Sequence, residues 1–309
     1  MATLALPLSV GNDARRSPGW LPKAVGSEKR SSCRRLQPVA LHGQLRHYTR
    51  IPGGVGAMTV GISIVCKDGI VMGCDSLATF SRGAPVSRFT NKLFIIEHKD
   101  LASPVAMVGA GMTAFMDKFL DRAKREGIAI AAAEIKRKLD VVDFVERVCE
   151  TIVTLLVKEY AIDRNRFFGG PVSDFSLSML VAGTTSPDHG TAELRSYNIH
   201  TIGLAESIDG YGTIGSGAPY AELFLHGLVP EPQKTSVKDA IGLVCHAIKG
   251  VEIMDPNVGG ETRVCALQVD DKGKLSVIRQ PSPSLPKGAK DRMEGVLKKM
   301  STDMRKIVK

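Results

Sequence analysis

Residues 59–79, TVGISIVCKDGIVMGCDSLAT, carry the strongest structural signal in the chain. Residues 59–66 are rich in β-branched side chains, and residues 70–75 follow after a short Lys-Asp-Gly turn. Two strand-forming runs joined by an Asp-Gly turn are typical of a β-hairpin. We therefore predict an antiparallel hairpin whose second strand ends at Asp75, beside the threonine that opens the first strand.

Groups of strands alternate with pairs of helices in the rest of the chain. The predicted strands are residues 59–66, 70–75, 92–97, 104–109, 175–183, 193–197, 263–269 and 274–279. The predicted helices are residues 112–126, 139–160, 219–227 and 236–251, and we expect the first to end at Gly127. This order favours two layered antiparallel sheets with helices on both outer faces. No Gly-rich phosphate loop follows the first strand, which argues against a nucleotide-binding βαβ fold.

The chain has 309 residues and a formal net charge of +9, but this charge is unevenly distributed. Residues 1–57 hold nine Lys or Arg against Asp13 and Glu28, which accounts for +7 of the total. The rest of the chain is nearly neutral, so we do not expect nucleic acid as a partner. No stretch without a charge is longer than residues 101–116, which are fewer than the roughly 20 apolar residues of a membrane-spanning helix, so we expect no membrane association.

Residues 1–58 are predicted to be a disordered leader, because they are rich in Pro, Ser and Gly and show no sustained hydrophobic period. The leader is compatible with a propeptide, with an Arg-rich targeting segment, or with a misassigned start, since Met58 directly precedes the first strand. A further alternative is a basic segment that binds RNA or a membrane surface. Residues 281–309 are predicted to form a Pro/Ser-rich linker and a basic amphipathic helix.

The cysteines do not form a recognisable metal or disulfide pattern. They lie at positions 33, 66, 74, 149, 245 and 265, without a CxxC motif or a histidine at ligand spacing. We interpret them as buried thiols of a protein in a reducing compartment and predict a cytoplasmic location. No metal ion or organic cofactor is predicted.

Thr59 has the chemistry of a nucleophile if the residues before it are removed. Its free α-amine would have a pKa near 8 and could accept the proton of its own hydroxyl. Asp75, at the end of the second hairpin strand, and Lys92, at the start of the third strand, could lie beside this hydroxyl and lower its pKa. Taken singly, each residue has a simpler interpretation: Thr59 as a strand-forming residue, Asp75 as a turn cap and Lys92 as an exposed strand end.

Together with NKLFII at 91–96, these segments resemble the start of a proteasome β-type subunit, an N-terminal-nucleophile (Ntn) threonine peptidase. Residues 214–225, IGSGAPYAELFL, are similar to the Gly-Ser-Gly stretch before the third helix of that family. Residues 254–267, MDPNVGGETRVCAL, are similar to its Asp-containing loop and following strand. The resemblance implies the Ntn-hydrolase fold, an α+β four-layer αββα sandwich of two antiparallel sheets, over residues 59–280. Asp-Ser at 75–76 also resembles the bacterial Anbu group, and HslV-type relatives share the pattern.

The resemblance also implies an activity and a set of site residues. The implied activity is a threonine-type endopeptidase acting on polypeptides inside a homo- or hetero-oligomeric ring, with α-type subunits or an ATPase unfoldase as partners. The alternative on the same fold is a non-catalytic structural subunit. Six positions match catalytic positions of the family, namely Thr59 as nucleophile and base, Asp75 and Lys92 as its activating pair, Gly109 as backbone oxyanion donor, and Ser216 and Asp255 as the residues that hold the terminal amine.

Three positions depart from the family pattern. Met58 precedes Thr59 where β-type propeptides end in Gly, which favours simple methionine removal over self-cleavage. Val258 replaces a serine of the amine-positioning network, and Leu77 replaces a frequent arginine.

Overall fold

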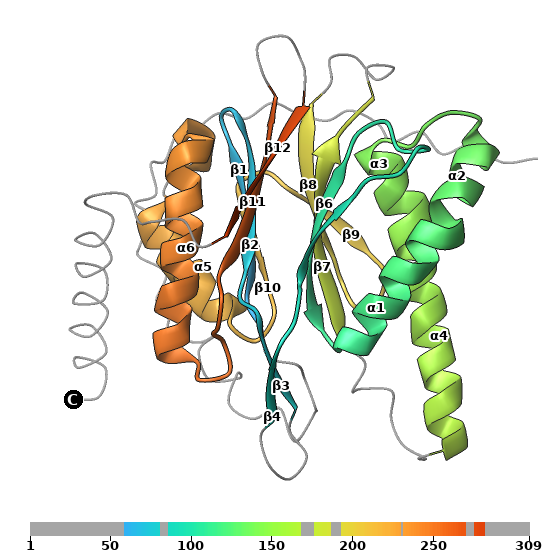
Figure 1. The fold of residues 1–309 in the computed structure, drawn as a ribbon, viewed down its shortest axis with the longest axis horizontal. Coiled ribbons are helices and arrows are strands. Elements are labelled where there is room, and N and C mark those ends of the chain that lie inside the picture. The colour runs from blue at the N-terminus through green and yellow to red at the C-terminus, as the bar shows by residue number, and fades with distance from the viewer. Residues whose placement is uncertain are drawn as a thin grey trace, which may run out of the picture. The chain divides into compact units, whose positions relative to one another are not determined.

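The computed structural model describes residues 59–80, 86–167, 176–186, 193–229, 231–269 and 275–281. All of them belong to one unit, Pro52–Lys309. Within it, two five-stranded antiparallel sheets face each other and helices cover the outer face of each (Figure 1). The predicted α+β fold with four αββα layers is therefore confirmed. The predicted leader and the predicted C-terminal helix lie outside the described residues.

The first sheet is built on the predicted hairpin. In spatial order its strands are β10 (Tyr211–Ile214), β1 (Gly61–Cys66), β2 (Gly69–Cys74), β11 (Arg263–Val269) and β12 (Leu275–Pro281). Gly61 pairs with Cys74 across the hairpin. The Asp75 amide donates to the Val60 carbonyl at 3.3 Å. This register places Asp75 beside the residues that open β1, as the sequence predicts.

The second sheet has its strands in the order β5, β6, β7, β8 and β9. These strands are β5 (Leu93–Ile96), β6 (Val105–Gly111), β7 (Leu177–Thr184), β8 (Leu194–Ile199) and β9 (Ala205–Ile208), and a separate pair consists of β3 (Leu77–Phe80) and β4 (Val86–Phe89). β3, β4, β9 and β10 were not predicted from the sequence. Each of these strands has only four residues, too few for a period-2 pattern to stand out.

The helices form one layer on each side. The layer over the second sheet comprises α1 (Thr113–Arg122), a π-helical segment (Ala123–Gly127), α2 (Ile128–Ile135), α3 (Val141–Asp143), a second π-helical segment (Phe144–Cys149) and α4 (Glu150–Phe167). The layer over the first sheet comprises α5 (Ala218–Leu228) and α6 (Val237–Met254), with a short 3₁₀ turn (Pro232–Lys234) before α6.

The predicted helix end at Gly127 is wrong. Gly127 keeps helical dihedral angles, and the helix continues until Lys136, which adopts a left-handed conformation with φ of 57°. A Cβ at Gly127 would lie 3.2 Å from Ile152. Here glycine permits two helices to approach each other closely, and the burial of Ile128 in the core stabilises the continuation.

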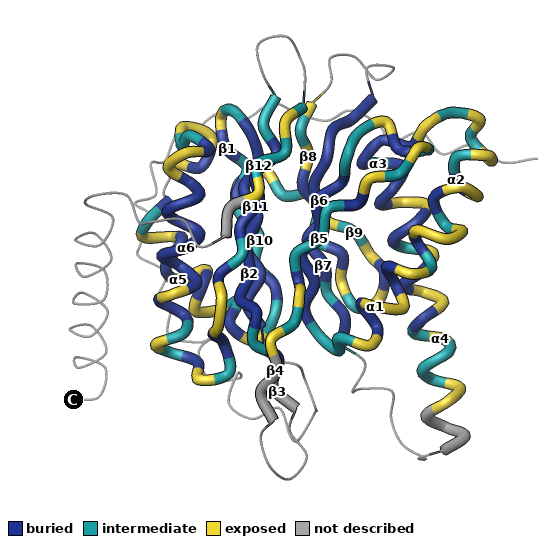
Figure 2. Tube along the Cα trace, in the orientation of Figure 1, coloured by how far each residue is buried: buried dark blue, intermediate teal, exposed yellow. Residues whose placement is uncertain are grey.

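Three clusters of buried apolar residues lie between the four layers. Figure 2 shows the buried residues on the strands and on the helix faces that meet them. One cluster joins the two sheets and includes Met72 of β2 and Val108 of β6. A second packs α1 to α4 on the second sheet around Phe119 and Phe144. The third packs α5 and α6 on the first sheet around Phe224. These clusters pack against β1, β2 and β5, and the candidate site lies at the ends of these three strands.

Candidate active site

Thr59, Asp75 and Lys92 meet at one end of the two sheets. The Lys92 ammonium donates a hydrogen bond to the Thr59 hydroxyl and a second one, of 2.9 Å, to Asp75 Oδ1. The Thr59 hydroxyl in turn donates to the same carboxylate oxygen at 3.1 Å. All three are buried, with exposed fractions of 1%, 0% and 5%. The structure therefore brings these three predicted residues into mutual contact.

Backbone groups hold the Lys92–Asp75 pair in place. Besides Lys92, the Asp75 carboxylate accepts from the amides of Val60 at 3.1 Å and of Leu77 and Gly259 at 3.2 Å each. The third proton of the Lys92 ammonium goes to the Leu77 carbonyl. These contacts compensate the cost of removing both charges from water. Leu77, where the family often has arginine, thus contributes through its backbone.

The main-chain nitrogen of Thr59 faces the other two predicted residues. It donates to Ser216 Oγ at 3.3 Å, and Ser216 Oγ donates to Asp255 Oδ2 at 3.3 Å. Asn257 donates to Asp255 Oδ1 through its amide and its side chain, each at 3.0 Å. The result is a chain of hydrogen bonds that fixes the Thr59 nitrogen. Val258, in the position of the family serine, is buried in the apolar cluster under α5 and α6.

The backbone conformation of Gly215 requires a glycine in the turn that precedes α5. It has φ of +92°, and a Cβ on it would lie 2.2 Å from the Thr59 carbonyl oxygen. Only glycine permits both the left-handed conformation and this close approach. The role of this glycine within the Gly-Ser-Gly stretch was not predicted from the sequence.

The assignment of Gly109 as oxyanion donor requires correction. Its amide already donates to the Lys92 carbonyl at 2.9 Å, and this backbone hydrogen bond extends the pairing of β5 with β6. Amides along a strand point alternately to its two neighbours. The Met112 amide bonds to Ser176 beside β7. The amide of Gly111 therefore points to the other edge of β6, beyond the start of β5 and toward the pocket that Thr59 lines. Sequence spacing alone does not distinguish the two glycines.

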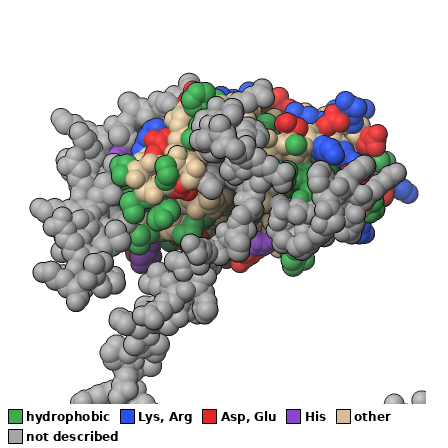
Figure 3. All heavy atoms as spheres, turned by 90° about the horizontal axis from the view of Figure 1, so that it is seen from below, with side chains coloured by type: hydrophobic (Ala, Val, Ile, Leu, Met, Phe, Trp, Pro, Cys, Tyr) green, Lys and Arg blue, Asp and Glu red, His purple; other side chains and the backbone are tan. Residues whose placement is uncertain are grey.

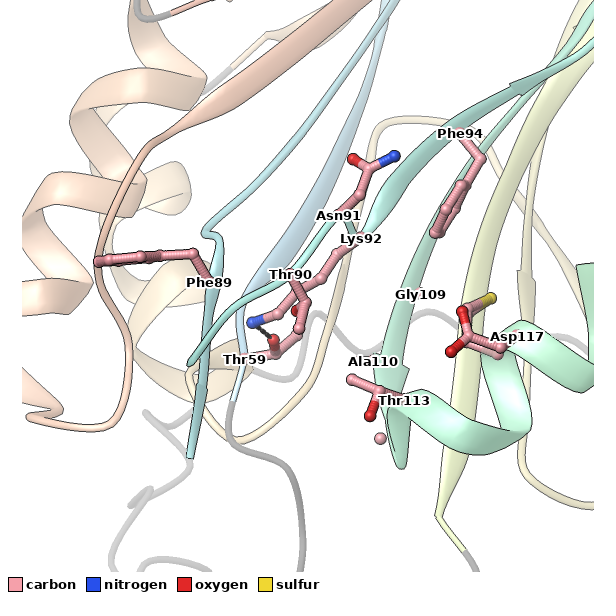
Figure 4. A pocket seen from close by; sticks show the side chains of 12 residues that line it. Thr59, Phe89, Thr90, Asn91, Lys92, Phe94, Gly109, Ala110, Thr113 and Asp117 are labelled. Carbon is pink, nitrogen blue, oxygen red and sulfur yellow. Dashed lines mark hydrogen bonds between the residues drawn. The ribbon is translucent and has the colours of Figure 1, made fainter. Parts of the chain in front are cut away.

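A pocket of about 310 Å³ opens beside Thr59 (Figure 4). It lies between the start of β5, the end of β6 and the first turns of α1. The residues that line it are Thr59, Phe89, Thr90, Asn91, Lys92, Phe94, Gly109, Ala110, Gly111, Thr113, Met116 and Asp117. The Thr59 hydroxyl and the end of β6 thus border the same space, which can admit a substrate group next to the hydroxyl.

The cysteines of the described part of the chain are not alternative nucleophiles. Burial raises the pKa of Cys66 and of Cys265 to about 12 and that of Cys245 to about 11. Burial also raises the pKa of Cys74 and Cys149 strongly. These thiols therefore stay protonated near neutral pH and lack the reactive thiolate form.

Within the described ranges, no group of three or more His, Cys, Asp or Glu is arranged to hold a metal ion. In the same ranges, no helix is long and apolar enough to cross a membrane.

Comparison with known proteins agrees with the sequence resemblance and the fold. The family model described as "Proteasome subunit" matches residues 56–267. A search of curated proteins returns no significant match. Two similar solved structures are an Anbu mutant from Hyphomicrobium sp. strain MC1 and Anbu, described as an ancestral beta-subunit, from Yersinia bercovieri. The first is 12% identical, covers 81% of this chain and 100% of its own, and has a TM-score of 0.54. The second is 15% identical, covers 81% and 96%, and has a TM-score of 0.52.

At these identities the two structures bear on the fold alone, while the family model spans most of the folded residues. The predicted resemblance to proteasome-like Ntn proteins is confirmed. The chain belongs to the proteasome subunit family.

Proposed function

We propose that this chain is a threonine-type endopeptidase whose Thr59 hydrolyses peptide bonds once its α-amine is free. The observation that carries the proposal is the contact of the Thr59 hydroxyl with both Lys92 and Asp75 at the edge of a pocket. A hydroxyl, a cation and a carboxylate in this arrangement form an activated nucleophile. Ser216 and Asp255 complete the site by holding the nitrogen that would serve as the base.

The reaction follows from these positions. The α-amine accepts the hydroxyl proton, Thr59 Oγ1 bonds to the substrate carbonyl carbon, and the Lys92 ammonium stabilises the negative charge that develops on Oγ1. When the scissile C–N bond breaks, the protonated amine returns the proton to the leaving nitrogen and an ester to Thr59 remains. The amine then takes a proton from water, which attacks the ester, and the acid product leaves with the Thr59 hydroxyl restored.

The amide of Gly111, rather than that of Gly109, is our proposed donor to the oxyanion. It points past the start of β5 toward the pocket that Thr59 borders. A backbone donor fixed at a strand end is pre-oriented and stabilises the tetrahedral intermediate without reorganisation. Gly111 has φ of +113°, and a Cβ would lie 2.1 Å from the Ser176 carbonyl oxygen, so a side chain is not tolerated there.

The assembly and the partners follow the family pattern. We propose that residues 59–280 form the catalytic domain of a homo- or hetero-oligomeric ring that acts on polypeptides in the cytoplasm, with α-type subunits or an ATPase unfoldase controlling access. Viewed from the end that carries the β3–β4 hairpin, the described surface mixes Lys and Arg with Asp and Glu (Figure 3). This mixture supports a protein partner over a nucleic acid.

The second candidate is a structural subunit without activity. It is favoured by Met58, because a residue other than glycine precedes Thr59 and self-cleavage is not indicated. While any residue stays attached, the Thr59 nitrogen is an amide that cannot accept a proton, and the site lacks its base.

The N-terminus of the purified protein is expected to be Thr59, because the proposed base exists only there. Intact mass and N-terminal sequencing, made on the same sample used for a fluorogenic peptide assay, check this. A chain that begins at Thr59 and hydrolyses peptides supports the peptidase. A chain that still carries residues 1–58 in assembled rings, and hydrolyses nothing, supports the structural subunit.

A further inference from the structure

Ser216 and Asp255, which connect to the Thr59 nitrogen, are held in different ways. Ser216 is placed by its neighbour Gly217, whose amide donates to the Thr59 carbonyl at 3.1 Å. Asp255 is fixed at its backbone, because its amide ends α6 by donating to the Val251 carbonyl at 2.8 Å. The orientation of the Asp255 carboxylate therefore depends on the groups that bind its two oxygens.

Two of those groups belong to Asn257. Its amide and its side-chain Nδ2 each donate to Asp255 Oδ1 at 3.0 Å, while Ser216 Oγ donates to Oδ2 at 3.3 Å. Pro256 and Asn257 are the central residues of a turn, which the Val258 amide closes by donating to the carbonyl of residue 255 at 3.1 Å. Proline presets the backbone of the first central position, and an aspartate that begins a turn accepts from the amide two residues on. The turn therefore directs both Asn257 donors at one carboxylate oxygen.

The Asp255 carboxylate needs these donors because its surroundings are unfavourable for a negative charge. It is only 9% exposed, and it lies at the C-terminal end of an 18-residue helix, where the helix dipole disfavours an anion. Within the described ranges no cation pairs with it. Hydrogen bonds thus take the place of a counter-ion, and Asn257 supplies two of the three donors that the described residues offer.

Three charged groups surround the nitrogen that would become the α-amine. Asp255 faces it through Ser216, while Lys92 and Asp75 both contact the hydroxyl of Thr59. Lys92 and Asp75 are paired with each other at 2.9 Å, so their opposite charges largely cancel at the amine. Asp255 has no such counter-charge in the described part of the chain, and the donors that bind it therefore have the larger influence on the amine.

We propose that Asn257 is a positioning residue of the peptidase, and that its side chain helps to set the pH at which the Thr59 α-amine acts as a base. The inference rests on the proposed function, because it concerns the amine that would accept the Thr59 hydroxyl proton. The N–H groups of Asn257 turn the positive ends of their dipoles toward Asp255 and offset part of its negative charge. A less negative neighbour favours the ammonium form less, so the amine is free to accept a proton at lower pH.

The test is the pH dependence of kcat and KM for one fluorogenic peptide in two variants. Asn257→Leu removes the side-chain donor at similar volume, and Asn257→Asp places a second carboxylate beside Asp255. Both make the surroundings of the amine more negative, so the acid limb of kcat/KM, which reports the pKa of the base in the free enzyme, should move to higher pH. We expect a movement of about 0.5 pH for Asn257→Leu and about 1 pH for Asn257→Asp.

The effect should fall on kcat rather than on KM. At pH 7 we expect kcat to fall about threefold in Asn257→Leu and about tenfold in Asn257→Asp, and to recover in both at alkaline pH as the amine loses its proton. KM should stay within about twofold, because Asn257 does not line the pocket beside Thr59. A residue that only stabilised the end of α6 would change the melting temperature without moving the acid limb.

The matched control is Gln233→Glu, which makes the same change from amide to carboxylate at an exposed side chain before α6. The 18 residues of α6 separate this position from Asp255 by about 27 Å, so the pH profile should stay unchanged. Thermal unfolding shows whether each variant is folded in the assay. If Asn257→Leu does not fold, Asn257→Asp, which keeps the shape of the side chain, carries the test.

Two results would count against the proposals, and they are distinct. A wild-type protein that hydrolyses the peptide, together with Asn257 variants whose acid limb stays in place, would overturn this inference and leave the peptidase standing. A wild-type protein that hydrolyses no peptide would overturn the proposed function and this inference with it.

Discussion

Replacing Thr59 with alanine is expected to lower kcat/KM for peptide hydrolysis by about 10⁴-fold or more, because no other group in the site can form the acyl bond. The described cysteines are buried and protonated, and Ser216 is engaged with Asp255 and with the Thr59 nitrogen. Loss of the hydroxyl removes the acceptor of a Lys92 hydrogen bond and one donor to Asp75. The measurement is steady-state hydrolysis of a fluorogenic peptide, with thermal unfolding of both proteins as the check on folding.

Thr59→Ser is the matched control for this variant. Serine keeps the hydroxyl, the α-amine and the contacts with Lys92 and Asp75, and it loses only a methyl group. We expect this variant to retain activity within about tenfold of the wild type, since the groups that react are all present. If Thr59→Ala hydrolysed peptides as fast as the wild type, the proposed mechanism would be wrong.

Replacing Lys92 with methionine is expected to abolish activity and also to destabilise the fold. Methionine retains most of the apolar stem but supplies no proton to Thr59, Asp75 or the Leu77 carbonyl. The Asp75 carboxylate, which is fully buried, would lose Lys92, the cation with which it pairs among the described residues. Breaking one side of a buried ion pair costs about 3–5 kcal/mol of unfolding free energy. Urea unfolding measures this loss, and peptide hydrolysis should fall by about 10³-fold or more because the developing charge on Thr59 is no longer stabilised.

A second substitution separates the two effects of Lys92→Met. Adding Asp75→Asn removes the unpaired buried charge, so the double variant should regain part of the lost stability while staying inactive. A Lys92→Met variant with wild-type stability and wild-type turnover would show that the buried pair neither holds the fold nor activates Thr59.

The contact of Thr59 with Asp75 could be predicted because it depends on local rules. An Asp-Gly turn between two strand-forming runs fixes the hairpin, and the register then places the end of the second strand beside the start of the first. Lys92 could be placed at the start of a strand, but that strand belongs to the second sheet. The contact of its side chain with Thr59 and Asp75 depends on how the two sheets face each other, which local patterns do not show. Ser216 and Asp255 lie 157 and 196 residues from Thr59, and only the family resemblance connected them.

The errors have equally specific causes. That the Gly109 amide donates to the Lys92 carbonyl could not be foreseen, because a sequence does not show which edge of a strand each amide faces. Gly127 was expected to end a helix, yet its missing Cβ serves the close packing of Ile152.

The site of covalent modification by an electrophilic peptide tests the central claim most directly. The protein would be incubated with a peptide vinyl sulfone, which adds irreversibly to an activated hydroxyl, and the modified residue located by mass spectrometry. The thiols described here, with their raised pKa values, should not compete. We predict one adduct, on Thr59 of an N-terminal peptide that begins with Thr59-Val60, together with complete loss of hydrolysis. An active protein modified at another residue, or one in which Thr59 is still preceded by Met58, would contradict the account.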